Sequence, residues 1–105
     1  MQRIRQWLKQ PREQTFVHMA TYRFHEVFPG GLAGRAQKDL VDCILAAVRE
    51  SCERYEWRLV AWDVLSDRVE VLLTGREPRG ENGETVAATL DSGVYEATGA
   101  QAVAN

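Results

Sequence analysis

The sequence has few of the residues that most restrict a fold or a reaction. Among 105 residues there are two cysteines, two histidines and three prolines. Cys43 and Cys52 lie nine positions apart in a segment that has the pattern of one helix, about 13 Å along its axis, which excludes a disulfide between them. No Cys-x-x-Cys pair is present. We therefore expect two free, buried or half-buried thiols, and neither a zinc site nor a redox site built on cysteine.

Long apolar runs are also missing. No stretch approaches the roughly 18 apolar residues of a membrane-spanning helix, and no apolar segment of secretory length follows the first basic residues. We expect no membrane segment, no signal peptide and a cytoplasmic location. The 45% of apolar and 27% of charged residues are typical of a globular protein, and the length allows one domain with one core.

Positive charge is concentrated near the N-terminus. Residues 1–12 contain four basic side chains and no acidic one, whereas the rest of the chain holds nine basic and fifteen acidic residues, a net charge of −6. Such a segment can contact nucleic-acid phosphates, or it can be a solvated terminus that aids solubility. We divide the chain into a basic arm (1–13), an α+β domain (14–97) and a flexible tail (98–105).

Hydrophobic periodicity predicts strands and helices in the order β-α-β-β-α. The pattern indicates a strand over 14–24, an amphipathic helix over 34–56, a hairpin of strands 57–64 and 68–73, a turn-rich loop over 75–83 and a weaker helix over 84–97. This order is that of a ferredoxin-like antiparallel sheet with two helices on one face, without the final strand.

Alternation predicts which side chains share a face of the hairpin. In the second strand, Val69, Val71 and Leu73 fall on one side. In the first strand the same rule groups four residues, Arg58, Val60, Trp62 and Val64. It also places Trp57 and Trp62 on opposite sides of their strand.

Two segments carry a family resemblance. The first is Phe16-Val17, followed by Thr21-Tyr22-Arg23 and Phe28; the second runs from Ala61-Trp62 through Leu65-Ser66-Asp67 and Arg68-Val69-Glu70 to Leu73. Together, and in this order, they resemble the single-tyrosine transposases of small bacterial insertion sequences, including those associated with repetitive extragenic palindromes, in the His-hydrophobe-His nuclease superfamily. The resemblance covers about residues 14–75.

The resemblance implies a reaction for which this chain lacks the residues. The family cleaves single-stranded DNA at the foot of a hairpin with a tyrosine hydroxyl, and a metal held by two histidines polarises the scissile phosphate. Arg68 and Glu70 stand at the histidine positions, and an arginine has no lone pair for a metal. Glu70 with Asp63 or Asp67 would leave at most a weak magnesium site. We favour a surface ion pair between Arg68 and Glu70, and no cofactor.

The nucleophile of the family is not matched either. Tyr95 is the only tyrosine after the hairpin, and Gly99 stands one helical turn later where the family has a metal-ligating polar residue. We interpret Tyr95 as an aromatic side chain that packs along the second helix.

Histidines and aromatic residues offer further candidates. His18 and His25 would face opposite sides of a straight strand, so we favour a structural histidine over a shared metal site. Unpaired bases could stack on exposed aromatic rings; the candidates are Trp7, Trp57, Trp62, Tyr22 and Phe24.

Two functions remain open. The first is a transposase-like protein that binds single-stranded or hairpin DNA without cutting it; its expected DNA contacts are Arg3, Arg5, Lys9, Arg12, Tyr22 and Arg23. The second is a non-catalytic protein–protein interaction module derived from the same fold. A sheet of three strands leaves an edge exposed, so we also expect a homodimer.

Overall fold

The computed structural model describes Ile4, residues 16–27 and residues 35–99. Along the chain these form β1 (Phe16–Arg23), α2 (Phe24–Val27), α3 (Arg35–Tyr55), β2 (Arg58–Val64), β3 (Arg68–Gly75), the 3₁₀ turn η1 (Glu81–Gly83) and α4 (Val86–Thr98). The predicted strands and the two long helices are present, with ends that differ by a few residues. The single turn α2 was not predicted.

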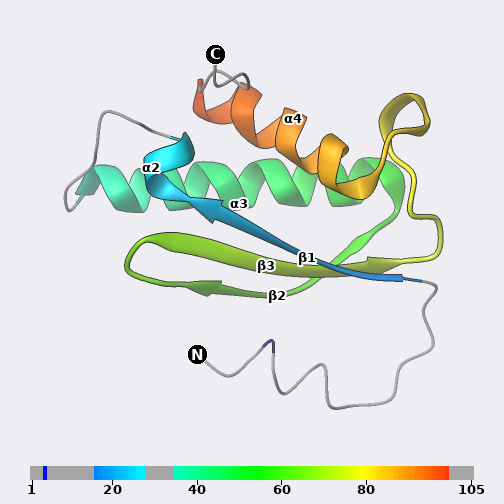
Figure 1. The fold of residues 1–105 in the computed structure, drawn as a ribbon, viewed down its shortest axis with the longest axis horizontal. Helices are drawn as coiled ribbons and strands as arrows, with labels where there is room; N and C mark the ends of the chain where they lie inside the picture. Colours follow the sequence, from blue (N-terminus) through cyan, green and yellow to red (C-terminus); the bar gives the residue numbers. More distant parts are fainter. Residues whose placement is uncertain (1–3, 5–15, 28–34, 100–105) are drawn as a thin grey trace.

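The three strands form one antiparallel sheet in the order β1-β3-β2 (Figure 1). Both long helices lie on the same side of this sheet. The predicted α+β class with an antiparallel sheet is therefore confirmed. Among the described residues β1 and β2 each pair only with β3, so both are edge strands.

The core lies between the sheet and the helices. Alternate residues of β3 point into it, and Val69, Val71 and Leu73 have no exposed surface, as their alternation predicted. From α3 the core receives Ile44 and Val48, and from α4 Leu90 and Val94. Burial of these apolar side chains is the main force that holds the layers together.

The first hairpin strand departs from strict alternation. Its register with β3 shifts between Leu59 and Ala61, because an extra residue, Val60, forms an irregularity of the kind that a β-bulge produces. Trp62 therefore packs against the same core as Trp57, although their odd spacing predicted opposite sides. The prediction that Arg58 and Val60 share the face of Trp62 was wrong for the same reason.

Local signals define the helix ends. α3 ends in a Schellman-type turn, in which the amide of Trp57 donates to the carbonyl of Cys52 and Glu56 takes a left-handed φ of 61°. At the start of α4, the Thr85 hydroxyl accepts a hydrogen bond from the amide of Ala88, and Gly99 ends the helix with a φ of 76°.

α3 and α4 pack directly against each other. A Cβ at Gly93 would lie 3.2 Å from the Ser51 hydroxyl, so this glycine allows the close approach. Cys43 on α3 contacts the carbonyl of Ala97 on α4 at 3.3 Å. Both cysteines are free thiols, Cys52 buried and Cys43 half-buried, as predicted.

We call the side of the sheet away from the helices the outer face. Its central residues are Leu72 on β3 and Ala61 on β2, and both are buried together with Ile4, which is 5% exposed. The rest of the predicted arm, residues 1–3 and 5–13, and the tail beyond Gly99 lie outside the described residues. No helix in the described segments is both long and apolar enough to cross a membrane.

Candidate functional site

Arg68 and Glu70 lie at the beginning of β3 on the outer face. Because side chains two residues apart on a strand share a face, they lie on the same side as Leu72 and opposite to Val69 and Val71. In the sheet register Arg68 is level with Arg23 of β1. Arg68 and Glu70 are therefore next to each other in space.

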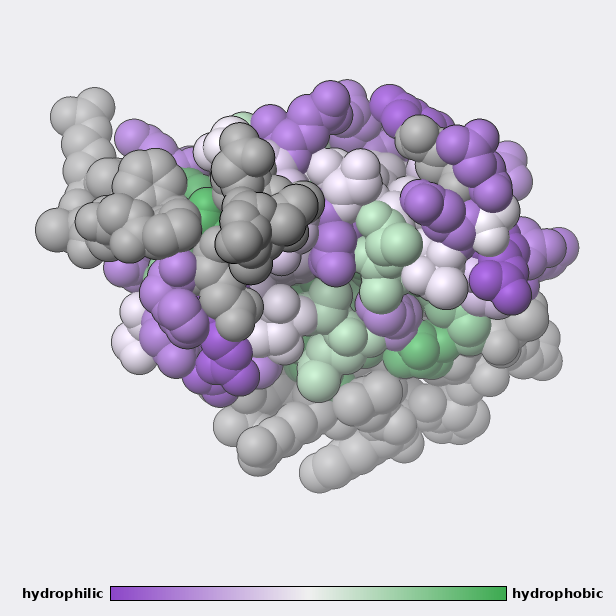
Figure 2. All heavy atoms as spheres, turned by 45° about the horizontal axis from the view of Figure 1, so that its top comes forward, coloured by the Kyte–Doolittle hydropathy of each residue, from purple (hydrophilic) through white to green (hydrophobic). Residues whose placement is uncertain are grey.

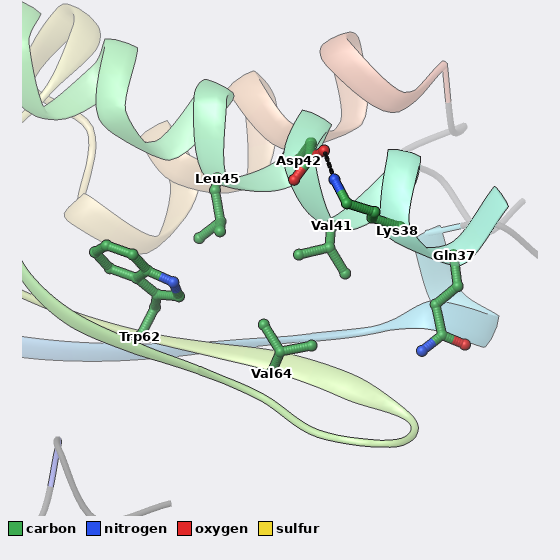
Figure 3. A pocket seen from close by; sticks show the side chains of 7 residues that line it. All are labelled: Gln37, Lys38, Val41, Asp42, Leu45, Trp62 and Val64. Carbon is green, nitrogen blue, oxygen red and sulfur yellow. Dashed lines mark hydrogen bonds and ion pairs between the residues drawn. The ribbon is translucent and has the colours of Figure 1, made fainter. Parts of the chain in front are cut away.

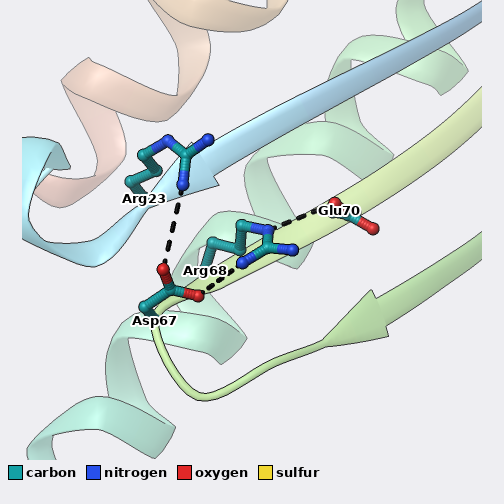
Figure 4. A network of polar contacts seen from close by, with 4 residues as sticks. All are labelled: Arg23, Asp67, Arg68 and Glu70. Atoms are coloured by element: carbon teal, nitrogen blue, oxygen red, sulfur yellow. Dashed lines mark hydrogen bonds and ion pairs between the residues drawn. The ribbon is translucent and has the colours of Figure 1, made fainter.

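An ion-pair network joins these positions (Figure 4). Arg68 donates from Nε to Glu70 at 3.2 Å and from Nη1 to Asp67 at 2.7 Å, and Asp67 also lies 3.8 Å from the guanidinium of Arg23. The hydrogen bonds to Glu70 and Asp67 raise the pKa of Arg68 above its ordinary value. The expected Arg68–Glu70 ion pair is present. Because an arginine side chain stays protonated, the Glu70 carboxylate keeps a positively charged partner.

Asp63 on β2 is the level neighbour of Glu70. Its side chain is buried, with 6% exposure, and Oδ1 has no hydrogen-bond partner in the structure as described. Asp63 and Glu70 thus place two carboxylates at neighbouring positions of β2 and β3. Within the described segments, however, no three His, Cys, Asp or Glu side chains come together as a group that could hold a metal ion.

Tyr95 lies on the other side of the sheet. Its helix, α4, covers the inner face, and the ring packs against the main core as the sequence predicted for a structural aromatic. The sheet therefore separates the Tyr95 hydroxyl from Arg68 and Glu70. A phosphate bound at the outer face could not be attacked from Tyr95 in this structure.

Tyr22 differs from its expected role. The side chain is 3% exposed and lies in the core, and its hydroxyl has no hydrogen-bond partner among the described residues. Burial is the main cause that raises the pKa of Tyr22, so the hydroxyl stays protonated. This burial speaks against a direct DNA contact by Tyr22. Of the expected DNA contacts, Arg23 is exposed on the outer face, whereas Arg3, Arg5, Lys9 and Arg12 lie outside the described residues.

The two histidines lie on different elements. His18 is half-buried on the inner side of β1, whereas His25 is exposed on α2. Burial lowers the pKa of His18, and the negative charge of Asp91 on α4 opposes this shift. Burial in turn raises the pKa of Asp91. No local sequence pattern indicated this His18–Asp91 pair, because the two residues are 73 positions apart.

A groove runs between α3 and the edge strand β2 (Figure 3). It has a volume of about 440 Å³ and is lined by Gln37, Lys38, Val41, Asp42, Leu45, Trp62 and Val64. Val64 at its floor is 46% exposed. Next to the groove, the guanidinium of Arg49 lies 4.9 Å from the centre of the Trp62 ring, within reach of a cation–π interaction.

The sequence pattern did not indicate this groove. It arises because the bulge at Val60 turns Trp62 and Val64 towards α3, and only the register with β3 shows that turn. The helical pattern of α3 divided its residues into an apolar core face and a charged solvated face. It did not show that a groove lies along the boundary between these two faces.

The fold and this site define an α+β domain with a three-stranded antiparallel sheet and two packed helices. No family model, no curated protein and no solved structure matches the chain. The assignment of function therefore depends on the geometry.

Proposed function

We propose that the chain is a non-catalytic protein–protein interaction domain with a ferredoxin-like arrangement, derived from the single-tyrosine transposase fold. The arrangement is supported by the strand order β1-β3-β2, with α3 between β1 and β2 and α4 after β3. The loss of cleavage is supported by the Arg68–Glu70 hydrogen bond at the metal-motif positions.

The protein-partner part of the proposal depends on β1 and β2, each of which has one edge that pairs with no other described strand. Unpaired backbone N–H and C=O groups at a sheet edge are a template for another strand. Exposed apolar side chains accompany both edges: Val17 and Met19 on β1 have 41% and 52% exposure, and Val64 lies on β2. Such residues at an edge favour association with protein.

Charge favours the same conclusion. The described residues include nine basic and fourteen acidic ones, a net charge of −5 that would repel a phosphate backbone. Figure 2 shows hydrophilic side chains around smaller hydrophobic patches on the face that it displays. Both arginines of the outer-face network already face carboxylates.

Sedimentation velocity across the micromolar range tests the proposal. We expect the purified chain to sediment with twice the 11.9 kDa mass of one copy, because a second copy is the one protein partner present in that sample. A monomer at every concentration would overturn the proposed self-association.

DNA binding is the second candidate, and one observation favours it. Arg23 projects from the outer face beside Asp67, at a longer distance than the other pairs of the network. Arg23 would add one phosphate contact to those expected from the four basic residues of the arm. A DNA-binding experiment for this candidate is given in the Discussion.

A further inference from the structure

An ordered series of charges follows the exposed side of α3, and two of its members, Lys38 and Asp42, line the groove between α3 and β2. Lys38, Asp42, Arg49 and Glu53 are all exposed and follow one another at helical spacing along one side of α3. Lys38 and Asp42 already form an ion pair of 2.9 Å on the groove wall. Their signs run plus, minus, plus, minus from the beginning of the helix to its end.

This order of charges allows two copies of α3 to pair in opposite directions, with each basic residue opposite an acidic one. If a second α3 lies antiparallel across a two-fold axis between positions 45 and 46, Lys38 is level with Glu53 of the second copy. Asp42 is then level with Arg49 of the second copy, and the reciprocal pairs repeat both contacts. A parallel arrangement in register would instead place like charges together.

The middle of the series suits a close helix contact. Ala46 is exposed and small, which lets two helix backbones approach each other. Leu45, beside it, lines the groove. The exposed Val64 and the half-buried Trp62 would lose contact with water when the second copy covers the groove.

We infer that a second copy of this chain binds at the groove between α3 and β2, with the two α3 helices antiparallel and the pairs Lys38–Glu53 and Asp42–Arg49 formed between copies. The inference rests on the proposed interaction function and names both the partner and the surface. It distinguishes this surface from the exposed edge of β1.

Charge reversal tests the pairing. K38E and E53K each convert two attractive contacts of the dimer into repulsive ones, so each should weaken dimerisation by about tenfold. The double variant K38E/E53K exchanges the signs and should return the dissociation constant to within about threefold of the original. Both side chains are exposed, and circular dichroism checks that each variant is folded.

Cross-linking tests the position of the axis. A cysteine at Ala46 should join two copies through a short bismaleimide, since position 46 lies beside the axis. R54C, an exposed position on another side of α3, is the matched control and should not cross-link above the level of the unmodified chain, which reports any background from Cys43 and Cys52.

The outcomes separate the two proposals. A monomeric unmodified chain would overturn the proposed self-association and this inference together. A dimer that both single reversals leave unchanged, or that cross-links equally through A46C and R54C, would overturn only the inference and would leave another surface, such as the β1 edge, as the interface. Failure of the double variant to recover would also overturn the pairing.

Discussion

Arg68 donates a hydrogen bond to Glu70, two residues further along β3, on the face of the sheet opposite to Tyr95. This relationship separates two parts that a single-tyrosine nuclease needs together. A metal-binding pair and a nucleophile must reach the same phosphate. In this chain Arg68 and Glu70 form an ion pair with each other, and Tyr95 lies on the other side of the sheet.

The first prediction introduces two metal-ligating side chains on the outer face without a nucleophile beside them. In R68H/E70H two imidazoles would share the outer face at alternate positions, beside the Asp63 carboxylate. We expect measurable binding of Mn²⁺ or Zn²⁺ by calorimetry, absent from the unmodified chain, and no cleavage of hairpin DNA. R68Q/E70Q is the matched control and should bind neither metal. A covalent protein–DNA adduct would contradict this prediction and would direct attention to Tyr95.

Local sequence patterns predicted the helices and strands correctly where the pattern lies within one segment. The 3.6-residue repeat of α3 and the alternation of β3 were sufficient, because each reports burial on one side of a single element. The hairpin turn before Arg68 was equally local. The face of Trp62 was not predictable, because the bulge at Val60 depends on the register with β3.

The candidate sites depended more strongly on tertiary structure. The i, i+2 spacing predicted the Arg68–Glu70 contact, but it did not predict that Asp63 would lie buried beside it. Tyr22 has the alternation of an inward residue as well as the chemistry of a DNA contact, and burial decided between the two. The groove combines α3 and β2, so no single segment contains its pattern.

The second prediction concerns the end of α3. Glu56 has a left-handed φ of 61°, a conformation in which glycine has no Cβ clash. We expect E56G to raise the free energy of unfolding by roughly 0.5–1 kcal/mol in urea titrations. R54G, two residues earlier inside the helix, should lower it by about 1 kcal/mol. Destabilisation by E56G would show that the Glu56 side chain contributes more than its backbone strain costs.

The third prediction is a pH dependence that comes from His18. Because burial lowers the folded-state pKa of His18 below 6.5, the unfolded chain binds a proton more readily. Stability from this group is complete above the unfolded pKa and decreases as the pH falls from about 7 to the folded pKa. Asp91, with its raised pKa, has the opposite dependence at lower pH, where stability decreases as the pH rises above 3.8.

Urea denaturation at pH 7 and pH 5 measures this effect. We expect H18Q to lose less stability than the unmodified chain between the two pH values, because glutamine does not titrate. H25Q, which removes the other imidazole of the chain at an exposed position on α2, is the matched control. Equal losses in H18Q and the unmodified chain would assign the dependence to other groups.

The last prediction decides whether the arm binds DNA. Deletion of residues 1–12 would also remove Ile4, which is buried against Ala61 and Leu72, so substitution is the better experiment. If the second candidate function, DNA binding, is right, the unmodified chain should bind a DNA hairpin with a log–log salt slope of roughly −3, from four phosphate contacts at about 0.7 each. Replacement of Arg3, Arg5, Lys9 and Arg12 by glutamine should abolish the binding and its salt dependence, since the described residues carry a net charge of −5.

A matched control variant loses the same four positive charges as the arm variant, but from the folded domain. In the control variant, four of the exposed arginines of the folded domain are replaced by glutamine: Arg54, Arg58, Arg76 and Arg79. If the arm provides the contacts, this control should keep the salt slope and lose at most a few-fold in affinity through long-range electrostatics. Equal losses in both variants would mean that net charge alone governs the binding. Retained affinity in the arm variant would instead place the contacts on the folded domain, where Arg23 on the outer face is an exposed cation to substitute next.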